Sequence, residues 1–406
     1  MLNVVILNGG RGASTIIPAL ISRQRLHVTS IVNAYDDGKS TGAIRRFFGM
    51  LGPSDIRKVQ ELMLSKDDPE HEHYVTLFQY RFPLDCNRED VLEQLKLFLG
   101  SESVELVGIH LNNIRVREKL KSFLAEFLAG LNTIEKARQE QFDFADCSIM
   151  NCLYAGAFLA SNRNIEQATI SIDRLFQLRG TVLPTSIEDK KLVAQRENGE
   201  ILYSEAEIVE LRSNVRVEQI YLLDQSLDRS TFEILDNNEK RSYLEQHHCY
   251  VGVSPGVRLA LQQADIIIYS AGTQHSSLYP TYMSAGLAAS ISDNHSALKV
   301  FITNIGADYE TPSYKASDYI LGAHRYLNLS DKRNYSMEEL FDVIFINQSH
   351  FKDDETYVEY DEEGFHDISV QTLIDVFESR NKLGKHDGTK VVQTILDLFE
   401  DKYFQV

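Results

Sequence analysis

The chain begins with an apolar run that breaks into a glycine-rich turn, and a second β-branched run follows. The first run is Val4–Leu7, the turn is Asn8-Gly9-Gly10-Arg11-Gly12-Ala13-Ser14-Thr15, and the second run is His27–Asn33. These patterns predict three elements, namely a strand at 3–7, a helix at 13–23 and a strand at 27–33. Strand, helix and strand in such close succession form a βαβ unit, which requires a parallel sheet and a right-handed crossover. The sequence therefore predicts an α/β fold.

The turn after the first strand has the composition of a phosphate-binding turn. Glycines permit positive φ and a close backbone approach, and the amides at a helix N-terminus attract anions. Many short turns of this kind bind nothing, so a purely structural turn is the alternative. The loop after the second strand, at 34–42, should lie beside this turn, because open α/β sheets gather such loops at the carboxyl ends of their strands. This placement favours ligand binding.

Carboxylates and cations are concentrated after the second strand. The segment Asp36-Asp37-Gly38-Lys39-Ser40-Thr41-Gly42 leads to Arg45, and Pro53-Ser54-Asp55-Ile56-Arg57 opens another helix. Carboxylates beside a phosphate turn suggest Mg²⁺ bridging the protein to a diphosphate, and arginines suit bidentate phosphate contacts. One alternative is that Asp36, Ser54 and Asp55 only cap helices. Another is that Asp36 or Asp37 binds the ribose of a dinucleotide. The hydroxyl- and arginine-rich continuation fits phosphate chemistry better.

A third polar loop follows a second buried strand, expected at Asp265–Ser270. The loop Ala271-Gly272-Thr273-Gln274-His275-Ser276-Ser277 suits a second phosphate, a base or a sugar, with an ordinary strand-to-helix connection as the alternative. His247-His248-Cys249 lacks a second ligand pair at zinc spacing, so we expect a surface loop there. We expect no Ser/His/Asp triad in this chain.

Periodicity organises the rest of the chain into one large domain and an extension. We expect a domain at 1–330 that contains a helical insertion at about 86–145 and a β-rich section at about 180–224, followed by an α/β extension at 331–406 packed on the core. An Asn198-Gly199 turn predicts a hairpin in the β-rich section. Further helices are expected at 43–49, 54–65, 71–80, 148–160, 164–178, 255–263, 369–380 and 389–401. Further strands are expected at 180–185, 191–196, 200–203, 207–211, 216–224, 299–303 and 343–346.

Composition restricts the partners and the compartment. A net charge of −18 argues against nucleic acid or an anionic membrane as a partner. The four cysteines include no C-x-x-C pair, which favours reduced thiols. No apolar run approaches the roughly 18–20 residues of a membrane span, and the first strand leaves no room for a signal peptide. We expect a cytoplasmic protein.

Seven motifs in chain order resemble those of the CofD/YvcK family, the 2-phospho-L-lactate transferase-like proteins (UPF0052). They are Asn8-Gly9-Gly10-Arg11-Gly12, Asp36-Asp37-Gly38-Lys39-Ser40-Thr41-Gly42-Ala43-Ile44-Arg45, Pro53-Ser54-Asp55-Ile56-Arg57, Phe78-Gln79-Tyr80-Arg81-Phe82, Asn151, Arg179-Gly180-Thr181-Val182-Leu183-Pro184 and Ser270-Ala271-Gly272-Thr273. The segment Tyr314-Lys315-Ala316-Ser317-Asp318-Tyr319 is also similar to a family segment. The resemblance spans 1–85 and 145–325.

The resemblance implies a Rossmann-like parallel sheet flanked by helices that binds a nucleotide diphosphate together with Mg²⁺. By position, Asp36 and Asp55 match family carboxylates associated with the metal. Ligand contacts are expected from Gly9, Gly10, Arg11, Gly12, Ala13, Ser14, Lys39, Ser40, Thr41, Arg57, Asn151, Gly272 and Thr273. Arg11, Lys39 and Ala271 depart from the family pattern. The two added cations favour a more anionic ligand than the family norm.

Two functions follow from the resemblance. The first is a Mg²⁺-dependent transferase that moves a phospho-linked group from a nucleotide diphosphate donor to an acceptor hydroxyl. In it Asp36, Asp55 and Arg45 are the expected catalytic residues, and Arg45 joins Arg11 and Lys39 in neutralising the diphosphate. The alternative is a YvcK-like regulator that binds a nucleotide sugar without turnover.

The insertion at 86–145 bears on the choice between these functions. A lid that excludes water helps a transfer reaction, so we expect this segment to close over the acceptor side of the site. The alternative is a subunit interface built from Leu120, Phe123, Leu124 and Phe127. We expect a nucleotide-linked small molecule as the partner and a homo-oligomer, a dimer, as the assembly.

Overall fold

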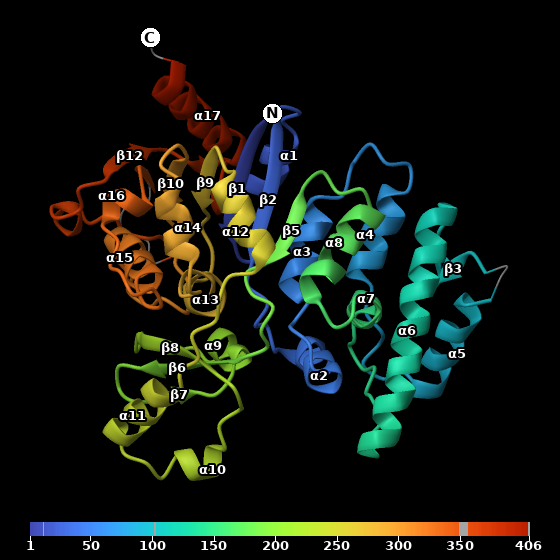
Figure 1. Cartoon of the computed structure of the whole chain (residues 1–406). Coiled ribbons are helices and arrows are strands. Elements are labelled where there is room, and N and C mark those ends of the chain that lie inside the picture. Colours follow the sequence, from blue (N-terminus) through green and yellow to red (C-terminus); the bar gives the residue numbers. More distant parts are fainter. Residues whose placement is uncertain (11, 101–102, 349–355, 405–406) are drawn as a thin grey trace.

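A seven-stranded parallel sheet forms the centre of the computed structural model, which describes residues 1–10, 12–100, 103–348 and 356–404 (Figure 1). The strand order is β12-β11-β10-β9-β1-β2-β5, and every pair in it is parallel. The strands are β1 (Leu2–Asn8), β2 (Leu26–Val32), β5 (Thr181–Pro184), β9 (Ile266–Tyr269), β10 (Leu298–Ile302), β11 (Val343–Asn347) and β12 (Gln371–Asp375). The predicted α/β fold with a parallel sheet flanked by helices is confirmed.

The first strand lies at the centre of the sheet because both of its faces are apolar. Val4, Val5, Ile6 and Leu7 are all buried, as expected of a parallel strand covered on both faces by helices. Val4 is in register with Val28 of β2 and with Ile266 of β9. The chain runs from β1 outward through β2 to β5, then returns to β9 on the other side of β1. The strand order therefore reverses between β1 and β9, which is where open α/β sheets bind ligands.

Helices cover both faces of this sheet and continue into the insertion. The N-terminal βαβ unit is present, although its helix α1 (Ile16–Ile21) is shorter than predicted. The C-terminal helix α17 (Gly388–Phe404) packs on α1, and a Cβ on Gly388 would overlap the Thr15 carbonyl oxygen. The other α-helices outside the β-rich section are α2 (Lys39–Phe48), α3 (Ser54–Leu62), α4 (His71–Gln79), α5 (Arg88–Phe98), α6 (Ile114–Arg138), α7 (Ile149–Ala160), α8 (Ile165–Leu175), α12 (Pro255–Gln262), α13 (Tyr279–Tyr282), α14 (Leu287–Asp293), α15 (Ala316–Leu327) and α16 (Met337–Leu340). A π-helical turn, η1 (Gln274–Leu278), and a 3₁₀ turn, η2 (Glu362–Phe365), complete the set.

The insertion at 86–145 is mostly helical, as predicted, and forms one side of the molecule (Figure 1). Helix α6 packs along α7, and a Cβ on Gly156 of α7 would overlap the Phe123 carbonyl oxygen. A small hairpin of β3 (Glu105–Leu106) and β4 (Ile109–His110), which periodicity did not predict, joins α5 to α6. Leu120, Phe123, Leu124 and Phe127 are buried within the chain itself, so the proposed subunit interface through them is wrong.

The β-rich section divides between two sheets. Strand β5 extends the central sheet, whereas β6 (Lys191–Arg196), β7 (Ile201–Leu202) and β8 (Val217–Leu223) form a separate antiparallel sheet. The predicted Asn198-Gly199 hairpin joins β6 to β7, with φ of +85° at Gly199. The strand expected at 207–211 is wrong, because helix α9 (Glu205–Glu210) occupies that segment. Two short helices, α10 (Arg229–Phe232) and α11 (Asn237–His247), follow β8.

The C-terminal segment belongs to the central sheet rather than lying only on its surface. Strands β11 and β12 continue the sheet beyond β10, and β13 (Glu378–Ser379) pairs with β14 (Lys382–His386). The helix expected at 369–380 is wrong. Apolar residues at Val370, Leu373 and Phe377 imitate helical spacing, but pairing with β11 makes this segment an edge strand. None of the described helices is both long and apolar enough to span a bilayer.

Candidate functional site

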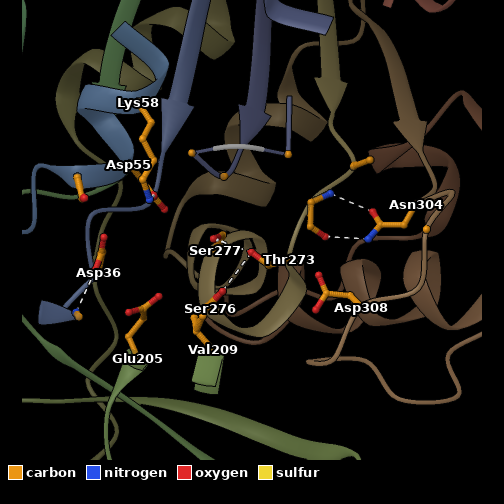
Figure 2. A pocket seen from close by; sticks show the side chains of 18 of the residues that line it. Asp36, Asp55, Lys58, Glu205, Val209, Thr273, Ser276, Ser277, Asn304 and Asp308 are labelled. Carbon is orange, nitrogen blue, oxygen red and sulfur yellow. Dashed lines mark hydrogen bonds and ion pairs between the residues drawn. The ribbon is translucent and has the colours of Figure 1, made fainter. Parts of the chain in front are cut away.

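A cavity of about 590 Å³ opens at the carboxyl ends of β1, β2 and β9, where the strand order reverses (Figure 2). Its walls come from the three loops, the start of α3 and Arg81, which the sequence motifs include, and from three segments that they do not include. The lining residues from the expected motifs include Gly9, Gly10, Gly12, Asp36, Lys39, Thr41, Asp55, Arg81, Gly272 and Thr273. The unexpected segments contribute Glu205, Ala206, Val209, Glu210, Asn304, Ile305, Gly306, Ala307, Asp308, Gly384, Lys385 and His386.

The glycines of the first turn are required for space. A Cβ on Gly9 would lie 2.8 Å from Ser277 Cβ, and one on Gly10 would lie 2.8 Å from Asp55 Cγ. A Cβ on Gly12 would lie 2.7 Å from the Cα of Gly272. Neither Gly9 nor Gly10 has a positive φ, so the conformational reason given for these glycines is not the one that applies. Each glycine lets the turn touch a different wall of the cavity.

The two carboxylates expected to hold a metal both line the cavity (Figure 2). Asp36 Oδ1 accepts a hydrogen bond from the Gly38 amide at 3.0 Å, and Asp55 Oδ1 lies 2.7 Å from Lys58 Nζ. Burial and then the nearby charge of Asp55 raise the pKa of Asp36 above its ordinary value. Asp55 does not cap helix α3, whose N-cap residue is Pro53 without a side-chain hydrogen bond. The interpretation of Asp55 as a helix cap is therefore wrong.

Asp37 and helix α9 add a third carboxylate to this part of the cavity. Asp37 Oδ1 accepts from the Ala206 amide at 3.0 Å, which ties α9 to the loop after β2. Glu205, on α9, faces the cavity, and burial together with the charges of Asp36 and Asp55 raises its pKa well above its ordinary value. The bond to Ala206 and the position of Asp37 outside the cavity lining argue against Asp37 as a ribose ligand.

Helix α9 was missed because Ile208 and Val209 look like a strand. The signal that could have identified it is Ser204 three residues before Glu207, because serine followed at that spacing by glutamate is the pattern of a capping box. In the structure, Ser204 Oγ accepts from the Glu207 amide at 3.2 Å, and Glu207 Oε2 accepts from the Tyr203 amide at 3.0 Å.

A hydrogen-bonded network fixes the third loop. Asn304 pairs with the backbone of Gly272 through two bonds, of 2.9 and 3.0 Å. The hydroxyl of Ser276 bonds to Thr273 Oγ1 at 3.1 Å and donates to Glu310 Oε1 at 2.5 Å. Glu310 is fully enclosed beneath the loop, and burial raises its pKa to about 8. The loop therefore presents its hydroxyls to the cavity from a rigid base (Figure 2).

The C-terminal hairpin closes the last side of the cavity. Gly384, Lys385 and His386 reach it from β14. Burial lowers the pKa of His386 to about 4, so its imidazole is neutral near pH 7. Sequence reasoning missed this wall because the residues lie in a segment without a motif.

Several expected residues lie elsewhere. Arg45 is buried, donates to the Tyr35 carbonyl at 2.5 Å and pairs with Asp189 at 2.5 Å, so its guanidinium holds the loop after β2 and does not reach the cavity. Asn151 is buried on α7, and neither of its side-chain polar atoms has a partner among the described residues. Ala13 and Ser40 are buried outside the lining, and Arg11 lies outside the described residues. Ser14 and Arg57 line a neighbouring cavity.

The insertion does not form a lid in this structure. Neither 86–100 nor 103–145 supplies a residue to the cavity lining, so the expected closure over the site is wrong for this conformation. Helix α9 contributes residues to the cavity lining instead. In the described part of the chain, no three or more histidine, cysteine, aspartate or glutamate side chains are grouped so that they alone could hold a metal ion.

Comparison with known proteins identifies relatives that match nearly the full length of this chain. A family model described as 2-phospho-L-lactate transferase CofD matches residues 4–394. The chain is 25% identical over 407 residues to a protein named gluconeogenesis factor from Listeria monocytogenes, covering 98% of this chain and 96% of that protein. It is 22% identical to a protein of the same name from Bacillus subtilis, covering 98% of each.

Two crystal structures share the fold. A Bacillus halodurans protein superposes with a TM-score of 0.67 at 20% identity, covering 97% of this chain and 99% of that one. A second structure, described as a member of the UPF0052 family from the same species, gives a TM-score of 0.66 at 20% identity and covers 98% and 100%.

Proposed function

The chain belongs to the CofD family, and from this premise we propose that it binds a nucleoside-diphosphate-linked small molecule in the cavity between β1, β2 and β9. The observation that carries the proposal is the convergence of the glycine turn, the Asp36–Asp55 carboxylate pair and the hydroxyl-rich third loop on one cavity. The turn offers a close approach to backbone amides, and Lys39 and Lys58 offer positive charge. The distant wall at Asn304 and Asp308 leaves room for a base or a sugar.

Mg²⁺ fits this arrangement through Asp36 and Asp55. Mg²⁺ in such sites takes one or two protein carboxylates and completes its coordination with phosphate oxygens and water. Asp36 and Asp55 line the cavity, and no group of three or more such side chains in the described residues could hold the ion alone, which agrees with that pattern. When bound, the ion would neutralise charge on the diphosphate. Lys58, now 2.7 Å from Asp55 Oδ1, would then be released toward the phosphate oxygens.

The proposed role is regulatory binding without turnover. The relatives that match almost the full length of the chain are named gluconeogenesis factors, and the insertion that would have supplied a lid lies away from the cavity. A transferase is the second candidate. It is favoured by the description of the family model and by the position of Glu205 in the cavity lining, since an ionised carboxylate there could accept a proton from an acceptor hydroxyl.

A binding screen followed by a turnover assay tests both proposals. Thermal shift over GDP, GTP, UDP-sugars and NADPH, with and without Mg²⁺, should identify a diphosphate ligand that stabilises the protein more strongly with Mg²⁺. Incubation of that ligand with the protein and phosphorus NMR of the mixture should show no loss of ligand. Consumption of the ligand would favour the transferase. Absence of any stabilising diphosphate would refute the binding proposal.

A further inference from the structure

A second cavity, of about 550 Å³, adjoins the first on the side of helix α3. The two cavities share four lining residues, namely Gly10, Lys58, Arg81 and Lys385. The residues found only in the second cavity are Ser14, Arg57, Glu61, Leu62 and Gln79. Gly10 of the first turn therefore separates two spaces. The larger space contains the carboxylates Asp36 and Asp55, and the smaller one is lined by four cations and one carboxylate, Glu61.

Arg57 is the central residue of the smaller cavity. Its side chain is only 6% exposed, and it has no carboxylate partner among the described ion pairs. One guanidinium nitrogen donates to the Phe78 carbonyl, whereas the buried Nε has no hydrogen-bond partner within the described residues. An arginine buried in this way is costly unless an anion pairs with it, because desolvation penalises an unpaired charge.

Three other cations line this cavity with Arg57, and two of them already have a carboxylate partner. Arg81 Nη1 lies 3.2 Å from Asp146 Oδ1, and Lys58 Nζ lies 2.7 Å from Asp55 Oδ1. Burial and then the nearby charge of Arg81 lower the pKa of Arg57. Lys385 lies on the exposed hairpin strand β14 at the rim of both cavities. Glu61 is the single acidic residue in the described lining, and its Oε1 already accepts from Gln79 Nε2 at 2.5 Å. Four cations therefore line the cavity, and Arg57 and Lys385 have no ion-pair partner among the described residues. Like charges repel, so an anion bound beside these two would stabilise the grouping.

We propose that the smaller cavity binds a second anionic group, a phosphate or a carboxylate, in addition to the diphosphate. This inference rests on the proposed function, which places the diphosphate in the larger cavity. Arg57 and Arg81 would supply planar, bidentate contacts, and Lys385 would approach from the rim. The ligand is then either a nucleotide-linked molecule with its own acidic group or a nucleotide bound beside a separate anion.

Calorimetry with two kinds of probe tests the proposal. Inorganic phosphate is titrated into protein saturated with UDP or GDP, whichever binds. Separately, a nucleotide sugar is compared with its matched uronate, either UDP-glucose with UDP-glucuronate or GDP-mannose with GDP-mannuronate. We expect phosphate to bind the saturated protein, or the uronate to bind at least about tenfold more tightly than the sugar, as expected for one charge-assisted contact. The first result identifies a separate anion, and the second an acidic group on the ligand.

Variants assign the effect to the cavity. Arg57→Gln should weaken the anion-dependent part of binding about ten- to a hundredfold and leave the affinity for the plain nucleotide unchanged. Because Arg57 is buried and its replacement can disturb folding, Lys385→Gln on the exposed strand is a second variant with an expected loss of about threefold to tenfold. Arg46→Gln, at an exposed arginine that lines neither cavity, is the matched control and should change nothing.

The outcomes separate this inference from the proposed function. If the nucleotide binds but neither probe adds affinity, or if folded Arg57→Gln and Lys385→Gln variants behave as the wild type, the second anion site is refuted and the proposed function stands. If phosphate competes with UDP or GDP for a single site and the uronate binds no more tightly than the sugar, the inference is also refuted. If no nucleotide binds while phosphate binds in a manner that depends on Arg57, the anion site stands and the proposed function fails.

Discussion

Glu310→Gln should change how the stability of this protein depends on pH. Glu310 lies beneath the third loop, where its Oε2 accepts from the Ser276 amide at 2.9 Å and its Oε1 from the Ser276 hydroxyl at 2.5 Å. Burial, with a smaller contribution from the charge of Asp308, raises its pKa from 4.5 to about 8. Glutamine keeps the size and the acceptor of the side chain but cannot ionise.

The size of the effect follows from that shift. Between pH 4.5 and about 8 the carboxyl is protonated when folded and ionised when unfolded, so folding takes up a proton. The contribution of Glu310 to stability is fully present below pH 4.5 and is lost as the pH rises through the folded-state pKa. The loss is about 1.4 kcal/mol per pH unit, or roughly 4 kcal/mol between pH 5 and 8.

Urea unfolding at several pH values measures this difference. The stability of Glu310→Gln relative to the wild type should rise steadily from pH 5 to pH 8, by an amount of that order. Glu363→Gln, at an exposed glutamate, should show no such trend. If the difference between Glu310→Gln and the wild type is the same at pH 5 and at pH 8, then Glu310 is ionised in the folded protein and the reasoning is refuted.

Four further predictions concern the site. Gly10→Ala should weaken diphosphate binding at least about tenfold in calorimetry, because the new Cβ would displace Asp55 and Lys58 at a cost of about 1–3 kcal/mol. Gly252→Ala is the control and should have no effect, because no described atom beyond its two chain neighbours lies within 4 Å of a Cβ at that position. Asp55→Asn should remove the Mg²⁺-dependent part of the ligand affinity, and equal affinities with and without Mg²⁺ in the wild type would contradict a metal at this position. Arg45→Gln should lower the free energy of unfolding by about 3 kcal/mol, because it removes a buried ion pair, and the folded variant should keep its ligand affinity. A loss of ligand affinity without a loss of stability would show that Arg45 contacts the ligand. Ligand should slow amide hydrogen exchange in α9 and the three loops and leave the exchange rates of α5 and α6 unchanged. Slower exchange in α6 would support the insertion as a lid.

The local parts of the fold and site were predictable, and the parts that depend on distant pairing were not. The βαβ unit, the Asn198-Gly199 hairpin and the loops at Gly10, Asp55 and Gly272 each carry their signal within a few residues. Their convergence then follows from the geometry of a parallel sheet.

The unpredicted parts have no comparable local signal. Lys385 reaches the cavity only because β12 pairs with β11 and carries the following hairpin to that edge, and the apolar spacing of β12 itself resembles a helix. The prediction that Arg45 contacts the ligand is wrong for a related reason. The preceding segment, 38–42, resembles a phosphate-binding loop, but Arg45 pairs with Asp189, which lies far along the chain, and its side chain therefore does not reach the cavity.

The central position of β1 affects how the protein can be made. Strand β1 is synthesised long before one of its two neighbours, β9, which begins at Ile266, and before the hairpin that completes the cavity, which ends at His386. Until β9 has been synthesised, β1 can pair only with β2, so one edge of this apolar strand is left open to wrong partners. Such long-range pairing also slows folding. The complete cavity can therefore form only after the hairpin ending at His386 has been synthesised, and ligand binding would stabilise the chain from that point on.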